Sequence, residues 1–249
     1  MVTEKISLQE HLVELKRRII FCVTFLIVAF CTCYFFSAEI YQFLLQPLAE
    51  SFADQQNRRL IYTSPAEGFI TFTRVAFYAA LFFSLPVFFI QLYLFLAPAL
   101  FKKEKKFIIL LLFFAPFLFL CGAALAYFFL LPLTFKFFLS FEAQGLVGSS
   151  IIPIQLETKI SEYLNLIIDL LFSFGIAFQS PILLLFLFRI GFLTPDDLRK
   201  RRKYWIVIIF IVAAILTPPD VLSQISLAIP MILLFEIVIL IGNKINKLK

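Results

Sequence analysis

The feature that most constrains this chain is a series of long apolar segments separated by short charged ones. About 20 apolar residues span the hydrocarbon core of a bilayer, and four segments approach or exceed that length, at residues 19–36, 69–97, 107–131 and 164–190. Lipid offers no hydrogen bonds to the backbone, so a spanning segment of this kind must form a helix. The pattern therefore predicts an all-α membrane protein.

Two further apolar segments follow a basic run at residues 199–203. They cover residues 204–216 and 221–241, and the tetrapeptide TPPD at 217–220 separates them with two prolines that interrupt a helix. The first of them would be only about 20 Å long at 1.5 Å per residue, so we expect it to thin the bilayer or to lie behind its neighbours. No linker-like tract divides the chain. We therefore expect six spans in a single domain covering residues 1–249.

The distribution of Lys and Arg predicts how these spans are oriented. An even number of spans places both termini on one side, and the segments on that side carry seventeen of the 22 cations. Basic residues accumulate on the cytoplasmic side of a membrane, which predicts cytoplasmic termini and explains the net charge of +6 without nucleic acid. Of the two outer loops, at residues 37–68 and 132–163, the first contains an amphipathic stretch at 40–52 that we expect to cap the helices.

Residue types needed for catalysis or for metal binding are scarce. The sequence contains no HExxH motif, no glycine-rich phosphate loop and a single histidine, His11, so no Ser-His-Asp set can be assembled. The four cysteines lie in apolar segments without the paired spacing of a metal or redox site, and we expect them to be buried. We predict that the chain is not an enzyme and has no cofactor.

Polar side chains inside apolar spans are costly in lipid and are therefore functional candidates. The alternative, equally open for each of them, is a polar group satisfied by neighbouring helices. One function that such residues would support is that of a secondary solute or ion transporter with a midplane site formed by Asp169, Gln179 and Glu236. The full set is Glu67, Arg74, Asp169, Gln179, Asp220, Gln224 and Glu236.

Two carboxylates outside the spans, Glu14 and Glu104, lie among cations. Neighbouring positive charge keeps a carboxylate ionised. Glu14 has Arg17 and Arg18 at helical spacings, so ordinary solvated pairing is one interpretation, and recognition of a cationic ligand is the other.

Several motifs follow one another in a fixed order along the chain. They are HLVELKRR at 11–18, SPAEGF at 64–69, FLAPALFKKE at 95–104, AYF at 126–128, PDDLRKRR at 195–202, LTPPDVLSQ at 216–224 and AIPMILLFE at 228–236. Together they resemble the TatC family, the polytopic signal-peptide receptor subunit of the twin-arginine, or Sec-independent, protein translocase.

The resemblance implies a concave, glove-like bundle of six helices that binds the twin-arginine signal peptides of folded proteins at its cytoplasmic face. It implies a bacterial plasma membrane, or an organelle membrane of bacterial descent, and transport driven by the proton-motive force. The implied partners are single-span TatA and TatB subunits and further copies of the receptor itself.

The resemblance also assigns roles to individual residues. Glu14 and Glu104 match the acids that recognise the signal peptide, with Arg17 at the same site, and two carboxylates suit two guanidinium forks. Thr217 and Gln224 match positions that contact the partner helices. The remaining matched positions carry structural expectations: Pro47 shapes a loop, Pro86 kinks a helix, and Phe95 and Tyr127 pack beside the recognition loop. Asp220 caps or orients the Pro-Pro turn, and a local hydrogen bond between Asp220 and Thr217 is the simpler interpretation.

Two residues depart from the family pattern. Lys16 stands where arginine is usual, which keeps the charge but removes a bidentate fork. Gln179 stands where many relatives carry glutamate, and an amide does not titrate. We therefore expect no proton coupling through Gln179.

Overall fold

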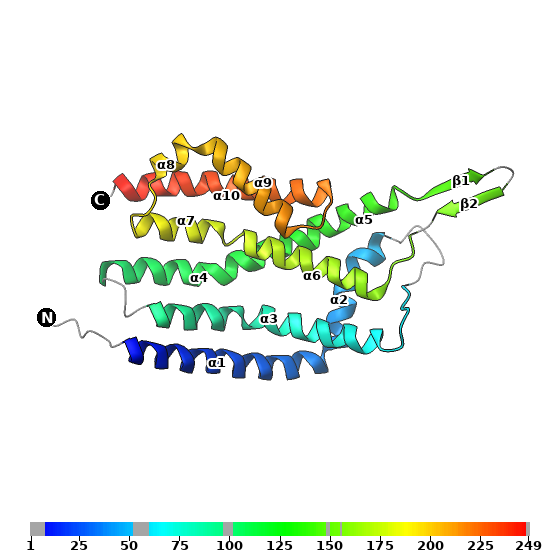
Figure 1. The fold of residues 1–249 in the computed structure, drawn as a ribbon, viewed down its shortest axis with the longest axis horizontal. Helices are drawn as coiled ribbons and strands as arrows, with labels where there is room; N and C mark the ends of the chain where they lie inside the picture. Colours follow the sequence, from blue (N-terminus) through cyan, green and yellow to red (C-terminus); the bar gives the residue numbers. More distant parts are fainter. Residues whose placement is uncertain (1–7, 52–59, 97–101, 148–149, 155, 248–249) are drawn as a thin grey trace.

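The structure is a computed structural model that describes residues 8–51, 60–96, 102–147, 150–154 and 156–247, without the side chains of 8, 96, 102–106, 143–154 and 244–247. Long helices run side by side along its longest axis (Figure 1). Five stretches are long and apolar enough to cross a membrane, which confirms the expectation of a helical membrane protein: Gln9–Phe35, Glu67–Phe95, Phe107–Leu139, Ile160–Arg189 and Val221–Asn243.

The first half of the bundle is built on a long helical pair. Helix α1 (Leu8–Phe35) packs along α3 (Glu67–Leu96), and the outer face of α1 exposes apolar side chains such as Ile27, as a lipid-facing helix does. Between them, α2 (Ser37–Ser51) lies across one end of the bundle (Figure 1). The amphipathic stretch in the first outer loop therefore forms the expected cap.

Pro47 lies inside α2, so the expectation that it shapes a loop is wrong. Proline lacks the N–H that would bond the carbonyl four residues earlier, here that of Phe43. The Tyr127 hydroxyl instead donates to the Phe43 carbonyl at 2.6 Å, and the Tyr163 hydroxyl donates to the neighbouring Leu44 carbonyl at 2.7 Å. Two tyrosines thus satisfy the carbonyls beside the proline and fasten α2 to the bundle.

The third long helix is longer than the apolar run suggests. Helix α4 (Lys102–Leu125) continues through a π-helical turn η2 (Ala126–Leu130) into α5 (Leu131–Leu139), past the expected end at residue 131. Proline is tolerated in the first turn of a helix, so Pro132 in α5 does not end it. The second outer loop then forms an antiparallel hairpin of β1 (Ala143–Val147) and β2 (Ser150–Ile154).

The fourth span is broken, not continuous as expected over residues 164–190. It consists of α6 (Ile160–Ala177) and α7 (Ser180–Arg189), separated by Phe178 and Gln179. Pro181 has no N–H to offer the Ala177 carbonyl, which explains why the helix is interrupted at this point.

The last three helices form a compact unit. A capping box between Thr194 and Asp197 starts the short α8 (Pro195–Lys200), and α9 (Arg202–Leu216) then packs against α10 (Val221–Lys247). At 15 residues, or about 22 Å, α9 is the short element expected at 204–216. Oδ1 of Asp220 accepts the Ser223 N–H at 2.7 Å, which confirms the predicted cap.

The main core joins α2, η2 and all the helices from α5 to α10. Its fully buried side chains include Leu130, Ile167, Phe174 and Leu227. Helices α4 and α6 cross closely because glycines meet the neighbouring helix: a Cβ on Gly122 would lie 2.5 Å from the Phe174 carbonyl oxygen, and one on Gly175 would lie 2.5 Å from the Phe119 ring.

Candidate functional site

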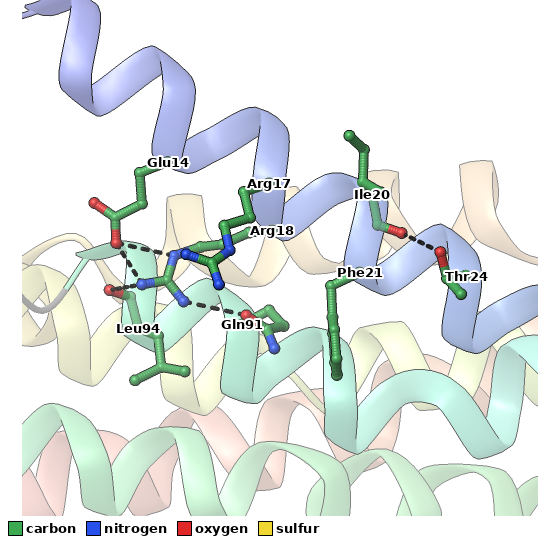
Figure 2. Close-up of a pocket in the computed structure, with 8 residues that line it drawn as sticks. All are labelled: Glu14, Arg17, Arg18, Ile20, Phe21, Thr24, Gln91 and Leu94. Carbon is green, nitrogen blue, oxygen red and sulfur yellow. Dashed lines mark hydrogen bonds and ion pairs between the residues drawn. The ribbon is translucent and has the colours of Figure 1, made fainter.

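The first motif forms an ionic cluster where the start of α1 faces the end of α3. Glu14 and Arg18 are one helical turn apart, and Nε of Arg18 donates to Oε1 of Glu14 at 3.1 Å, while Nη2 donates to the same oxygen. Nη1 of Arg18 also donates to Oε1 of Gln91, and Nη2 to the Leu94 carbonyl, each at 3.1 Å (Figure 2). A single guanidinium thus joins the Glu14 carboxylate to α3.

This cluster lies at one end of an elongated groove. The groove has a volume of about 540 Å³ and is lined by Glu14, Arg17, Arg18, Ile20, Phe21, Thr24, Gln91 and Leu94. Leu94 lies beside the charged residues, and Phe21 forms an apolar wall further along α1 (Figure 2). Such a groove suits a ligand with a cationic group next to an apolar segment.

The carboxylate of Glu14 retains one acceptor atom. Both Arg18 bonds end on Oε1, and Figure 2 shows the second oxygen pointing away from Arg18. Arg17 is exposed and lines the groove, and no ion pair involving it occurs within the described part of the chain. Of the two pairings considered from the sequence, Glu14 to Arg17 or to Arg18, the fold forms the second.

The neighbouring family-matched residues are divided between the two ends of the bundle. Phe95 stacks on His11 with ring centroids 4.3 Å apart, as expected beside the recognition segment. Tyr127 lies against α2 at the opposite end, so its expected place beside that segment is wrong (Figure 1). Pro86 lies within α3, and the kink expected there stays a prediction.

The second predicted acid, Glu104, lies in the first turn of α4, at the same end of the bundle as the start of α1 (Figure 1). Its side chain is outside the described part of the structure. Helix α8 and the C-terminal end of α10 reach the same end, so the basic segments of the sequence gather there.

The residues matched to partner contacts lie at the turn between α9 and α10. Thr217 is buried, and its hydroxyl donates to the Ala213 carbonyl at 2.9 Å, not to Asp220. The amide of Gln224 donates to the Phe210 carbonyl at 3.3 Å. The Thr217 hydroxyl therefore bonds the last turn of its own helix, whereas Gln224 connects α10 to α9.

The polar residues within the spans do not form one midplane site. Gln179 donates from Nε2 to the Ala115 carbonyl at 2.9 Å, and Glu236 pairs with Arg202 through both carboxylate oxygens. Asp169 is exposed on α6 and does not line the cavity beside Gln179. The geometry gives the transporter alternative no shared site.

At the end of the bundle opposite the two termini, polar side chains join α3 to α6. Glu67 accepts from the Thr63 N–H at 2.8 Å and from the Ser161 hydroxyl at 2.5 Å, joining the start of α3 to the start of α6. Arg74 donates to Asn165 at 3.1 Å between the same two helices. These contacts favour a structural role for Glu67 and Arg74.

Two residues that make these contacts were missed in the sequence analysis, and the burial of two cysteines was misjudged. Gln91 is an amide inside an apolar span, the same signal that singled out Gln179, and could have been found in that way. Tyr163 gives no such signal, because tyrosine is common near membrane interfaces. The expectation of buried cysteines holds for Cys33 but not for Cys31 and Cys121, which are exposed on helices that face lipid.

Among the described residues, no group of three or more His, Cys, Asp and Glu side chains is placed to hold a metal ion.

Comparison with known proteins places the chain in a family. Residues 10–230 match the family model of the Sec-independent protein translocase protein (TatC). The TatC of Rickettsia prowazekii is 45% identical over 240 residues, covering 96% of this chain and 94% of the relative. The TatC of Escherichia coli K12 is 38% identical over 227 residues, covering 91% and 84%.

The fold agrees with a solved structure of the same family. A crystal structure of "Twin Arginine Translocase Receptor- TatC in DDM" superposes with a TM-score of 0.75 at 34% identity, covering 94% of this chain and 99% of that one. These matches confirm the resemblance drawn from the motifs. The chain therefore belongs to the TatC family and is a membrane component of the Sec-independent protein translocase, and not an enzyme.

Proposed function

We propose that this chain is the twin-arginine signal-peptide receptor of its translocase, with the groove beside Glu14 as part of the binding site. The observation that carries the proposal is the acceptor oxygen of Glu14 at the mouth of a groove with an apolar wall (Figure 2). A signal-peptide arginine would bind this oxygen, and the apolar part of the peptide would follow the groove. Glu104 would bind the second arginine, and Arg17 would line the entrance.

Arginine is the side chain that such a site favours. A guanidinium offers a planar fork of donors, whereas a lysine ammonium is a compact and strongly hydrated charge. Arg18 already pairs with Glu14, so the field at the site is weak and selectivity depends on geometry. Removing either acid would weaken binding by about 2 to 5 kcal/mol if the pair is desolvated.

The rest of the proposal concerns topology and assembly. Helix α9 would be the sixth crossing, giving cytoplasmic termini in a bacterial plasma membrane, or in an organelle membrane of bacterial descent, and a concave bundle of one domain over residues 1–249. Single-span TatA and TatB helices would dock along α9 and α10 near Thr217 and Gln224, and further copies of the chain would join the complex. The proton-motive force would drive transport, with Gln179 taking no part in proton transfer.

Site-specific photo-crosslinking tests the proposal. A photoreactive side chain near Glu104 in inside-out vesicles is offered folded precursors with Arg-Arg or Lys-Lys signals. We expect only the Arg-Arg precursor to crosslink, and Glu14→Ala or Glu104→Ala to abolish the adduct. Glu10→Ala, on the same stretch of α1, serves as a matched control. Equal crosslinking of both precursors would refute the receptor role.

A further inference from the structure

A second groove lies on the opposite side of the basic end, between α7 and α9. Its deeper part, here called the apolar groove, has a volume of about 370 Å³ and is lined mainly by apolar side chains, among them Leu184, Trp205, Ile208, Val212 and Phe235. The rings of Trp205 and Phe235, with centroids 6.0 Å apart, form one wall. It lies within the hydrophobic length of the bundle.

A second cavity, which includes charged side chains, adjoins the apolar groove. This cavity has a volume of about 770 Å³ and is lined by Asp197, Arg201 and Tyr204 at the start of α9, together with Phe192 and Leu193. Trp205 and Ile208 line both spaces. The two spaces therefore adjoin each other at these side chains, and each has a volume typical of ligand pockets, about 300 to 1,000 Å³.

The charged end favours an anion. Residues 195–203 carry five cations against two acids, and Lys203 lies over the Tyr204 ring at 5.2 Å from its centroid, beside the cavity. The acid in the lining, Asp197, has Oδ2 occupied by the Thr194 hydroxyl at 2.6 Å and by the Thr194 N–H at 3.2 Å. Arg202 is already paired with Glu236, which leaves Arg201 as the guanidinium that faces the cavity.

We propose that these two adjoining spaces together bind one anionic phospholipid, with its phosphate at Arg201 and Lys203 and one acyl chain in the apolar groove. The charge pattern matches an anionic head group, and the apolar lining matches a hydrocarbon chain entering from the bilayer. Trp205 lies where the two meet, at the depth that indole rings prefer. The bound lipid would fill the space between α7 and α9.

The site is separate from the predicted partner contact. With 3.6 residues per helical turn, Trp205, Val212 and Leu216 share one side of α9. Phe210, whose carbonyl binds Gln224, and Thr217 lie more than a quarter-turn away from it. A TatA or TatB helix at Thr217 and Gln224 would therefore leave the lipid site open.

Native mass spectrometry of the purified full chain tests the charged end. The protein is titrated with phosphatidylglycerol and with phosphatidylcholine of identical acyl chains. We expect one retained phosphatidylglycerol per chain, and Arg201→Gln should lower its affinity about fivefold, the effect of one basic side chain near a membrane surface. Arg199→Gln, on the same basic run but outside the cavity lining, should change nothing. Equal retention of the two lipids, or equal losses in the two variants, would overturn the proposal.

A filled groove tests the apolar end. Val212→Trp should abolish retention of the lipid, and Ile211→Trp, which adds the same ring on another side of α9, should not. If Val212→Trp unfolds the protein, the smaller change Ile208→Phe serves instead. A photoreactive side chain at Ile208 in native membranes should gain the mass of a phospholipid. Adducts with protein alone, or retention that depends on charge but not on groove filling, would show that no lipid occupies this site.

Discussion

At the scale of single residues, Arg18 determines which carboxylate oxygen of Glu14 can bind a ligand. Its Nη1 is held by Gln91 and its Nη2 by the Leu94 carbonyl, so the guanidinium meets Glu14 at one oxygen only. An incoming guanidinium would use the other oxygen. Gln91, which lines the groove and holds Arg18, would thereby position the site.

Replacing Gln91 should therefore weaken signal-peptide binding. In Gln91→Ala, Arg18 is released to turn and pair with both oxygens of Glu14. We expect the affinity for an Arg-Arg signal peptide to fall about tenfold, which corresponds to one hydrogen bond to a charged group at about 1.5 kcal/mol. Fluorescence anisotropy with a labelled peptide measures this affinity. The double variant Arg18→Gln with Gln91→Ala should recover the affinity, and a failure to recover would contradict this coupling.

A second prediction at this scale concerns Asp197 and the pH dependence of the stability of α8. The Thr194 hydroxyl and N–H hold the pKa of this carboxyl below its usual range, with smaller help from Arg201 and Lys200. A depressed pKa means that the stabilisation is present above the unfolded value, near 3.9, and is lost as pH falls through the folded value. Between pH 6 and pH 3, the hydrogen-exchange protection factors of the α8 amides, taken relative to the intrinsic rate at each pH, should fall more in the wild type than in Asp197→Asn. Asp196→Asn, outside the capping box, should behave like the wild type.

At the scale of elements, side chains compensate for breaks in helices. Pro47 removes a donor from α2, and the hydroxyls of Tyr127 and Tyr163 donate to the carbonyls nearby. A buried carbonyl without a donor costs about 1 to 3 kcal/mol. The cap over the bundle therefore depends on two residues that are distant from it in sequence.

A double-mutant cycle checks this compensation. Tyr127→Phe should destabilise the protein by about 1 to 3 kcal/mol in reversible detergent unfolding. In the Pro47→Ala background most of that cost should disappear, because an N–H at position 47 can bond the Phe43 carbonyl. Tyr62→Phe, at an exposed tyrosine, is the control. Equal costs in both backgrounds would mean that Tyr127 acts by packing alone.

The crossing of α4 and α6 gives another prediction for an element pair. Gly175→Ala would place a Cβ against the Phe119 ring, and such overpacking costs about 1 to 3 kcal/mol. Gly68→Ala, where nothing lies within 4 Å of the new Cβ, should be neutral or slightly stabilising. The melting temperatures of the two variants are compared by thermal unfolding. Similar melting temperatures would exclude a tight crossing of α4 and α6.

At the scale of the whole molecule, the number of crossings depends on α9. Five stretches are long enough to span a bilayer, and α9 is shorter than any of them. In Figure 1 the turn between α9 and α10 stops short of the end reached by α3 and α5. A sixth crossing would therefore require a locally thinned bilayer.

Labelling from one side of the membrane decides between five and six crossings. Single cysteines are placed at Tyr62, Arg199 and Pro219 in a cysteine-free background and treated with a membrane-impermeant thiol reagent. With six crossings, the cysteines at Tyr62 and Pro219 react from the same side and the one at Arg199 from the other. Reaction of Pro219→Cys on the side of Arg199→Cys would mean that α9 does not cross.

The sequence by itself determined the membrane class, the long spans, the cap in α2, the short α9 and the family, because lipid admits only helices of a minimum length and the motifs follow in order. Only the tertiary structure decided which groups are partners. Arg18 meets Gln91, Tyr163 meets α2, and Trp205 joins two cavities. Periodicity and length act within a segment, whereas these contacts depend on how distant helices pack, which local patterns do not encode.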